Sequence, residues 1–127
     1  VDVERGHNIK DFLVLGKSVF SQQEYGDLEA VSPVNRRNRF LTYWTLKEAY
    51  IKARGMGLSI PLGEFSYQLG NEEIVIEFHE GILDDPNAWQ FHQAFVTEQH
   101  SLAVALRISQ GDPIPIQMEW MSPTQLV

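Results

Sequence analysis

The helix-forming sequence WTLKEAYIKARGMG, residues 44–57, is the most informative stretch of this chain. Aromatic and aliphatic residues fill it, which is typical of a helix that packs into a core. Among them stand Lys47, Glu48 and Lys52, and Gly55 follows as a helix stop. Glu48 and Lys52 are four residues apart and therefore share one face of the helix. This pair is either a surface ion pair or part of a site that holds a divalent metal ion and a phosphate.

Three helices are predicted in the first half of the chain, at residues 9–20, 21–30 and 32–54. Ser21 and Glu24 have the Ser-x-x-Glu spacing of a capping box, which indicates where the second helix begins. Pro33 suits the first turn of the third helix, because its missing N–H has no partner there in any case. The third helix contains the quoted stretch and is by far the longest.

Strands are predicted on both sides of these helices, at residues 1–5, 65–69, 74–78, 89–96, 101–108 and 114–121. Gly70 and Asn71 form a turn between two of them, and a second hairpin turns at residues 97–100. Pro113 and Pro115 restrict the last strand to the edge of a sheet. Helices followed by antiparallel strands predict an α+β domain, in which an antiparallel β-sheet packs against the long helix.

The composition excludes several classes of function. The chain has 127 residues, enough for one domain, and 43% of them are hydrophobic. It has no cysteine, so disulfides, thiolate zinc sites and a cysteine nucleophile are excluded. No apolar run is long enough to span a membrane, and no signal peptide is recognisable, so we expect a cytoplasmic protein without a membrane partner. A net charge of −7 argues against a nucleic-acid partner.

The charges are distributed unevenly along the chain. Residues 1–54 carry nine Lys/Arg and seven Asp/Glu, whereas residues 55–127 carry one basic residue and ten acids. Several basic side chains lie near the start of the long helix, and two lysines precede it. This group is either a solvated surface or a site that attracts an acidic partner protein. These residues are Arg36, Arg37, Arg39, Lys10 and Lys17.

Two further acids stand at the start of the chain. Asp2 and Glu4 are two apart on a predicted strand, so they belong to the same face of the sheet. Paired carboxylates of this kind hold hard cations such as Mg²⁺, although exposed strands also carry such pairs without a metal. Glu48 is a candidate third ligand, and Lys52 one turn later would neutralise a phosphate held by the same metal.

These segments resemble the Sfp-type 4′-phosphopantetheinyl transferases. The family pattern is a Gly-Val-Asp-x-Glu strand followed by a Trp-Ser/Thr-x-Lys-Glu-x-x-x-Lys helix, Gly-x-Gly-Leu and Pro-Leu. The chain has VDVE at residues 1–4 and WTLKEAYIKARGMGLSIPL at residues 44–62. VFSQQEY at residues 19–25 and SLAVA at residues 101–105 resemble two further family segments. Three motifs in the family order and spacing make the resemblance specific.

The resemblance implies transfer of 4′-phosphopantetheine from coenzyme A to a serine of an acyl or peptidyl carrier protein. By motif position, the Mg²⁺ ligands would be Asp2, Glu4 and Glu48. Lys52 would contact a phosphate of coenzyme A, and Lys47 is either a second phosphate contact or a solvent-facing lysine. The catalytic base is left open between Glu24, which also fits the capping box, and Glu48.

Family members of this type are about twice as long and consist of two similar halves. The chain resembles the C-terminal half, begins inside a predicted strand and lacks the glycine before Val1. We therefore expect a single domain, residues 1–127, that lacks the N-terminal half and has little activity alone unless it self-associates. Two alternatives are a short holo-acyl-carrier-protein synthase, which builds its sites between identical subunits, and a non-catalytic carrier-protein-binding module.

Overall fold

The computed structural model describes residues 2–5 as backbone and residues 12–55, 60–71 and 73–108 in full. The helices are α1 (Phe12–Val19), α2 (Gln22–Ala30) and α3 (Pro33–Arg54), with two short 3₁₀ turns, η2 (Leu62–Glu64) and η3 (Pro86–Ala88). The strands are β1 (Asp2–Arg5), β2 (Phe65–Leu69), β3 (Ile74–Phe78), β4 (Trp89–Thr97) and β5 (His100–Arg107). The α+β class is confirmed.

The helix boundaries follow from their capping residues. The Ser21 side chain accepts a hydrogen bond from the Glu24 N–H, and the Glu24 side chain accepts one from the Ser21 N–H, so the predicted capping box is confirmed. Pro33 occupies the first turn of α3. Gly55 ends α3 at φ 69°, a left-handed conformation that glycine adopts without strain.

The strands form two antiparallel sheets. β1, β5 and β4 make a three-stranded sheet in that order, and β2 pairs with β3. Both predicted hairpins, β2–β3 and β4–β5, are therefore confirmed. The separation into two sheets was not predicted. The strand predicted at residues 114–121 lies outside the described residues, as do residues 9–11 of the first predicted helix.

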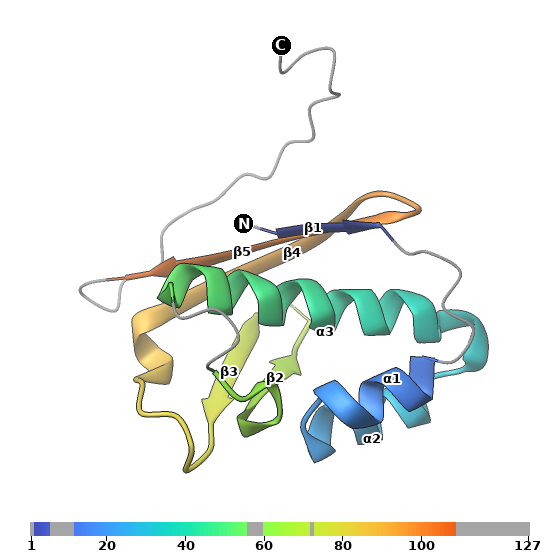
Figure 1. Ribbon diagram of the computed structural model, residues 1–127. Helices are drawn as coiled ribbons and strands as arrows, with labels where there is room; N and C mark the ends of the chain where they lie inside the picture. Colours follow the sequence, from blue (N-terminus) through green and yellow to red (C-terminus); the bar gives the residue numbers. More distant parts are fainter. Residues whose placement is uncertain (1, 6–11, 56–59, 72, 109–127) are drawn as a thin grey trace.

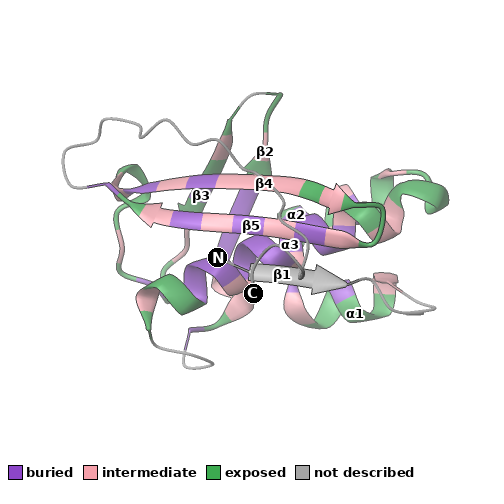
Figure 2. Ribbon diagram, turned by 90° about the horizontal axis from the view of Figure 1, so that it is seen from above, coloured by how far each residue is buried: buried purple, intermediate pink, exposed green. Residues whose placement is uncertain are grey.

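Helix α3 lies in the middle of the fold. The three-stranded sheet covers one side of it, and the β2–β3 hairpin with α1 and α2 covers the other (Figure 1). Figure 2 shows that buried positions gather along α3 and alternate along β5. Ten residues of α3 are buried as a result, which is more than one face of a helix can supply.

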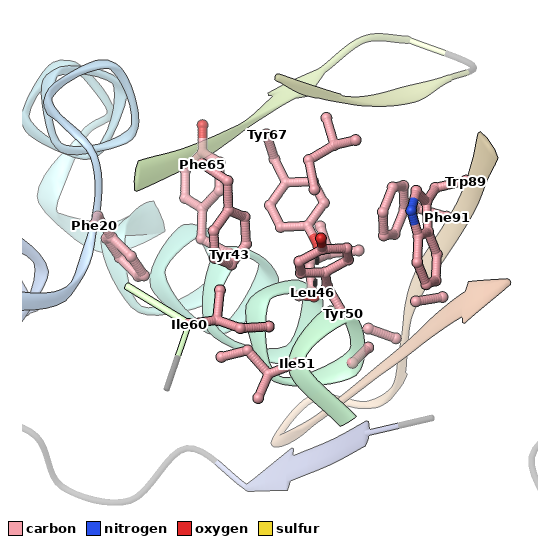
Figure 3. Packing of buried hydrophobic residues seen from close by; sticks show 14 of the residues in the cluster. Phe20, Tyr43, Leu46, Tyr50, Ile51, Ile60, Phe65, Tyr67, Trp89 and Phe91 are labelled. Atoms are coloured by element: carbon pink, nitrogen blue, oxygen red, sulfur yellow. Dashed lines mark hydrogen bonds between the residues drawn. The ribbon is translucent and has the colours of Figure 1, made fainter. Parts of the chain in front are cut away.

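Aromatic side chains fill the space between α3 and the strands (Figure 3). The Tyr50 ring of α3 lies 5.1 Å from the ring of Phe65 on β2 and 5.1 Å from that of Trp89 on β4. Tyr67 and Phe91 form a further edge-to-face contact at 5.0 Å. These contacts join both sheets to the helix, so the described elements share one core. Within the described residues, no helix combines the length and apolar character that crossing a bilayer requires.

Asp84, in the loop between β3 and β4, fastens the last turn of α3 to the sheet. Its Oδ2 accepts hydrogen bonds from Tyr50 Oη at 2.6 Å, Arg54 Nη1 at 2.8 Å and Trp89 Nε1 at 3.1 Å. The side chain is only 7% exposed. Burial opposes ionisation of Asp84, but these hydrogen bonds and one from the Asp85 N–H outweigh it, so its pKa lies below its ordinary value.

We expect Asp84→Asn to lower the free energy of unfolding by about 2 kcal/mol near neutral pH, because hydrogen bonds to a charged acceptor are lost. A folded-state pKa below the unfolded one stabilises the protein above the unfolded pKa, and this stabilisation is lost as the pH falls through the folded value. The difference between wild type and variant should therefore narrow below about pH 4. Urea unfolding at several pH values measures it, with exposed Glu80→Gln as the control. A difference that stays constant with pH would contradict this role of Asp84.

Candidate functional site

Glu48 and Lys52 lie on the side of α3 that reaches solvent. The Glu48 side chain is 25% exposed and that of Lys52 is 55% exposed, whereas their neighbours Ala49, Tyr50 and Ile51 are buried. Lys52 Nζ is 3.5 Å from Glu48 Oε2, so the two side chains form an i,i+4 ion pair. An exposed pair of this kind contributes at most a few tenths of a kcal/mol. The ion pair by itself therefore contributes little to the stability of the fold.

The backbone of β1 pairs with β5 and contacts α3. Asp2 is paired with Ala103 and Glu4 with Ser101, and both partners on β5 are buried beneath α3. Ser101 Oγ is 2.8 Å from Thr45 Oγ1, a direct hydrogen bond between β5 and α3. Since α3 and β5 run in the same direction (Figure 1), the chain positions of Asp2 and Glu48 both lie beyond this bond.

The predicted metal ligands come from these two elements, which are in contact. Among the side chains that the structure describes, no group of three His, Asp or Glu residues could hold a metal ion. The side chains of Asp2 and Glu4 are outside that set, so the three-carboxylate site stays a prediction. Glu48 is the one predicted ligand with a described side chain, and its partial exposure is compatible with binding an ion.

Lys47 and Glu24 form a buried ion pair. Both side chains are 0% exposed, and Lys47 Nζ is 2.8 Å from Glu24 Oε1. The same ammonium donates to the Leu62 carbonyl at 2.6 Å and the Phe65 carbonyl at 2.7 Å, and it lies 4.0 Å from the centre of the Phe65 ring. The second carboxylate oxygen of Glu24 accepts from the Tyr67 N–H at 2.8 Å. Burial lowers the pKa of Lys47, and the Glu24 carboxylate opposes that shift.

This geometry gives Lys47 and Glu24 a structural role. The three protons of an ammonium match the three acceptors around Lys47, and no part of the side chain is exposed to a ligand. The solvent-facing alternative for Lys47 is therefore wrong. The predicted phosphate contact of Lys47 and the predicted role of Glu24 as a base stay predictions, and neither side chain is exposed in the described structure. The periodicity of the α3 sequence did not reveal this pair, because the residues that bury Lys47 come from α2 and from the start of β2, which are distant along the chain.

The arginines at the start of α3 make contacts within the protein. Arg36 donates to the Leu28 and Glu29 carbonyls at the end of α2, and Arg39 pairs with Asp27 at 2.5 Å. Arg37 donates to the Glu98 carbonyl in the β4–β5 turn, at 3.1 Å. The cluster therefore fastens α2 and the turn to α3. A contact with an acidic partner protein stays a prediction.

Comparisons with known proteins are consistent with this arrangement. A family model described as the 4′-phosphopantetheinyl transferase superfamily matches residues 1–105. The chain is 39% identical over 69 residues to the 4′-phosphopantetheinyl transferase Sfp of Bacillus subtilis, covering 54% of this chain and 30% of that protein. It is 29% identical over 128 residues to the human L-aminoadipate-semialdehyde dehydrogenase-phosphopantetheinyl transferase, covering 93% of this chain and 41% of that protein.

The chain thus spans well under half the length of these curated relatives. Among solved structures, holo-[acyl-carrier-protein] synthase of Thermotoga maritima matches with a TM-score of 0.68 and 18% sequence identity. The match covers 86% of this chain and 61% of that one. At this identity, the similarity shows a shared fold.

We expect Lys47→Met to lower the free energy of unfolding by about 3–5 kcal/mol, because it leaves the Glu24 carboxylate buried without its partner. Lys52→Met makes the same chemical change on the exposed side of α3 and should cost less than about 0.5 kcal/mol. The double variant Glu24→Gln/Lys47→Met should recover part of the loss. Urea unfolding compares all three. Equal stability of Lys47→Met and Lys52→Met would show that the buried pair has no structural role.

Proposed function

The chain belongs to the 4′-phosphopantetheinyl transferase superfamily, and on this premise we propose that it takes part in modifying a carrier protein. The reaction moves the 4′-phosphopantetheine group of coenzyme A to a serine of an acyl or peptidyl carrier protein and releases 3′,5′-ADP. The observation that carries the proposal is the placement of Glu48 and Lys52. They are solvent-accessible charges on a helix that has ten buried residues.

Asp2, Glu4 and Glu48 are the residues that would hold Mg²⁺. Carboxylate oxygens are the ligands that this hard cation prefers, and a site with few protein ligands leaves positions for water and phosphate oxygens. The pairing of β1 with β5, and the contact of both strands with α3, support the grouping of these acids. When bound, Mg²⁺ would offset negative charge on the pyrophosphate of coenzyme A.

Lys52 would contact a phosphate of coenzyme A. Its side chain is long and 55% exposed. The helix turn that carries Lys52 is anchored by the ion pair between Arg54 and Asp84. A lysine ammonium acts as a mobile point charge, which suits a phosphate whose charge changes during transfer. Glu48 remains the candidate for orienting the serine hydroxyl, directly or through a water molecule.

We further propose that the chain is one half of a two-half active site. The relatives it matches are more than twice the length of the matching segment, which supports a second unit that contributes to coenzyme A binding. A second copy of this chain is the alternative contributor, as in synthases that build their sites between identical subunits. Copies of one chain usually associate in closed, symmetric assemblies.

The test is an intact-mass assay with apo-carrier protein, coenzyme A and Mg²⁺. The chain is assayed alone and together with the preceding half of a two-half relative. We expect Glu48→Ala and Lys52→Ala to reduce conversion by about a hundredfold, because each removes a charge that acts on the phosphates. Glu29→Ala, an exposed acid on α2, is the matched control and should be unaffected.

The outcomes separate the alternatives. Conversion by the chain alone would favour self-association, and conversion only with the added half would favour the two-half site. A complete assembly that stays silent with fatty-acid, polyketide and peptide-synthetase carriers would remove the transferase proposal. A carrier-protein-binding module without turnover would then remain.

Magnesium should raise the midpoint of thermal unfolding, because an ion that binds only the folded chain stabilises it by mass action. Glu48→Ala should abolish this shift. Lys52→Ala should keep it, because Lys52 contacts phosphate rather than metal in the proposed site. Differential scanning calorimetry with and without Mg²⁺ measures the shift independently of activity. An equal shift in Glu48→Ala would place the metal elsewhere.

A further inference from the structure

Two buried hydroxyl groups connect α3 to the strand β5. Thr45 of α3 and Ser101 of β5 are both 0% exposed, and their side-chain oxygens are 2.8 Å apart. The nearest positions on the same faces of the two elements are buried and apolar, namely Leu41 and Ala49 on α3 and Ala103 on β5. A hydrogen-bonded hydroxyl pair in such surroundings adds little net stability over an apolar pair of the same shape. It is directional, however, and can therefore fix how two elements lie against each other.

The donors and acceptors of this contact form an ordered series. The single hydroxyl proton of Thr45 is directed at the Leu41 carbonyl of its own helix, at 2.8 Å, so the Thr45 oxygen accepts from Ser101. The Ser101 oxygen accepts in turn from Gln93 Nε2 on β4, at 3.1 Å. The series thus joins β4, β5 and α3. A displacement of about 1 Å between α3 and β5 would stretch the hydroxyl contact beyond the usual range of about 2.5–3.0 Å.

The contact lies where the elements with the proposed metal ligands meet. Ser101 is the register partner of Glu4 in the antiparallel pairing of β1 with β5. Thr45 precedes Glu48 by three residues, and residues three apart are neighbours on a helix surface. In the part of the chain that the structure describes, β1 pairs with no strand other than β5, so the position of β1 depends on that of β5 (Figure 1). The hydrogen bond therefore links the backbone opposite Glu4 to the helix turn that carries Glu48.

We propose that Thr45 and Ser101 are positioning residues for the proposed Mg²⁺ site. Their hydrogen bond holds β5, and the β1 backbone paired with it, at a fixed place against the α3 turn that carries Glu48. This inference rests on the proposed function, because it takes Glu48 and the acids of β1 as the ligands. Neither hydroxyl is exposed, so neither acts by contact with the ion. Ligands from two elements must be held within about 0.5 Å of the binding geometry, and a directional contact between those elements supplies this precision.

Substitutions of Thr45 separate the effect of the hydrogen bond from that of packing. Thr45→Val keeps the shape but removes the hydroxyl, and it should lower the affinity for Mg²⁺ about tenfold, as loss of a group that orients metal ligands commonly does. Thr45→Ser removes a methyl group and should lower the midpoint of urea unfolding, yet it keeps the hydroxyl and the affinity. The double variant Thr45→Val/Ser101→Ala leaves neither hydroxyl of the pair unmatched. It should recover stability relative to Thr45→Val without recovering the affinity.

Thr42→Val is the matched control, since it makes the same chemical change on the same helix. Thr42 is 8% exposed, and its hydroxyl donates to the Asn38 carbonyl within α3. This variant should keep the affinity for Mg²⁺. Isothermal titration calorimetry with MgCl₂ on the full chain measures the affinity independently of turnover, and urea unfolding measures the stability of each variant.

The outcomes distinguish this inference from the proposed function. If Glu48→Ala abolishes Mg²⁺ binding while Thr45→Val and Thr42→Val bind equally well, the positioning role is overturned and the proposed site remains. An equal loss of affinity in Thr45→Ser and Thr45→Val would also overturn it, because packing rather than the hydrogen bond would then be responsible. A wild-type chain that binds no Mg²⁺ would remove the proposed metal site and the positioning role together.

Discussion

The buried ion pair between Lys47 and Glu24 is the interaction on which the packing of this fold depends. It joins three elements: Glu24 lies in the first turn of α2, Lys47 lies in the middle of α3, and their remaining hydrogen bonds go to the backbone around the start of β2. An isolated charge at such a depth would cost several kcal/mol. Here every proton of the ammonium has an acceptor, and the carboxylate accepts backbone bonds as well. The pair is tolerated because each charge has its counter-ion and hydrogen-bond partners, and removing either residue leaves a buried charge without its counter-ion.

The same pair determines how α3 is rotated. Consecutive residues of an α-helix are about 100° apart around its axis, so a buried Lys47 turns Glu48 toward the boundary of the core. The C-terminal end of α3 is anchored by Asp84, which accepts hydrogen bonds from Tyr50 and Arg54, on either side of Lys52. Glu48 and Lys52 therefore project from a segment held at two points. Functional side chains on a rigid element keep their geometry with little loss of entropy when a ligand binds, which is the arrangement that catalysis and metal binding require.

The sequence was sufficient for features that depend on local chemistry. The bounds of α3 follow from Pro33 and Gly55, the start of α2 follows from the capping box, and alternating residues with a Gly-Asn turn define the β2–β3 hairpin. It was insufficient for Lys47, because a lysine between apolar residues is usually at the surface, and its burial depends on a second layer that packs over α3. Asp84 was missed for a similar reason. Its partners are Tyr50, Arg54 and Trp89, and their distance along the chain gives no periodic signal.

The charges of α3 divide into groups according to what covers them. Near its start, Arg36 and Arg39 hold α2, in the middle Lys47 is enclosed, and Glu48 and Lys52 reach solvent. A helix buried on two sides has few positions where a charge can reach solvent. We expect a change of charge at those positions to destabilise the core less than a change at Lys47, which is fully buried. The adjacent residues Lys47 and Glu48 of the Lys-Glu motif therefore differ in role. Lys47 contributes to packing in the core, and Glu48 is partly exposed and is the residue proposed to take part in the chemistry.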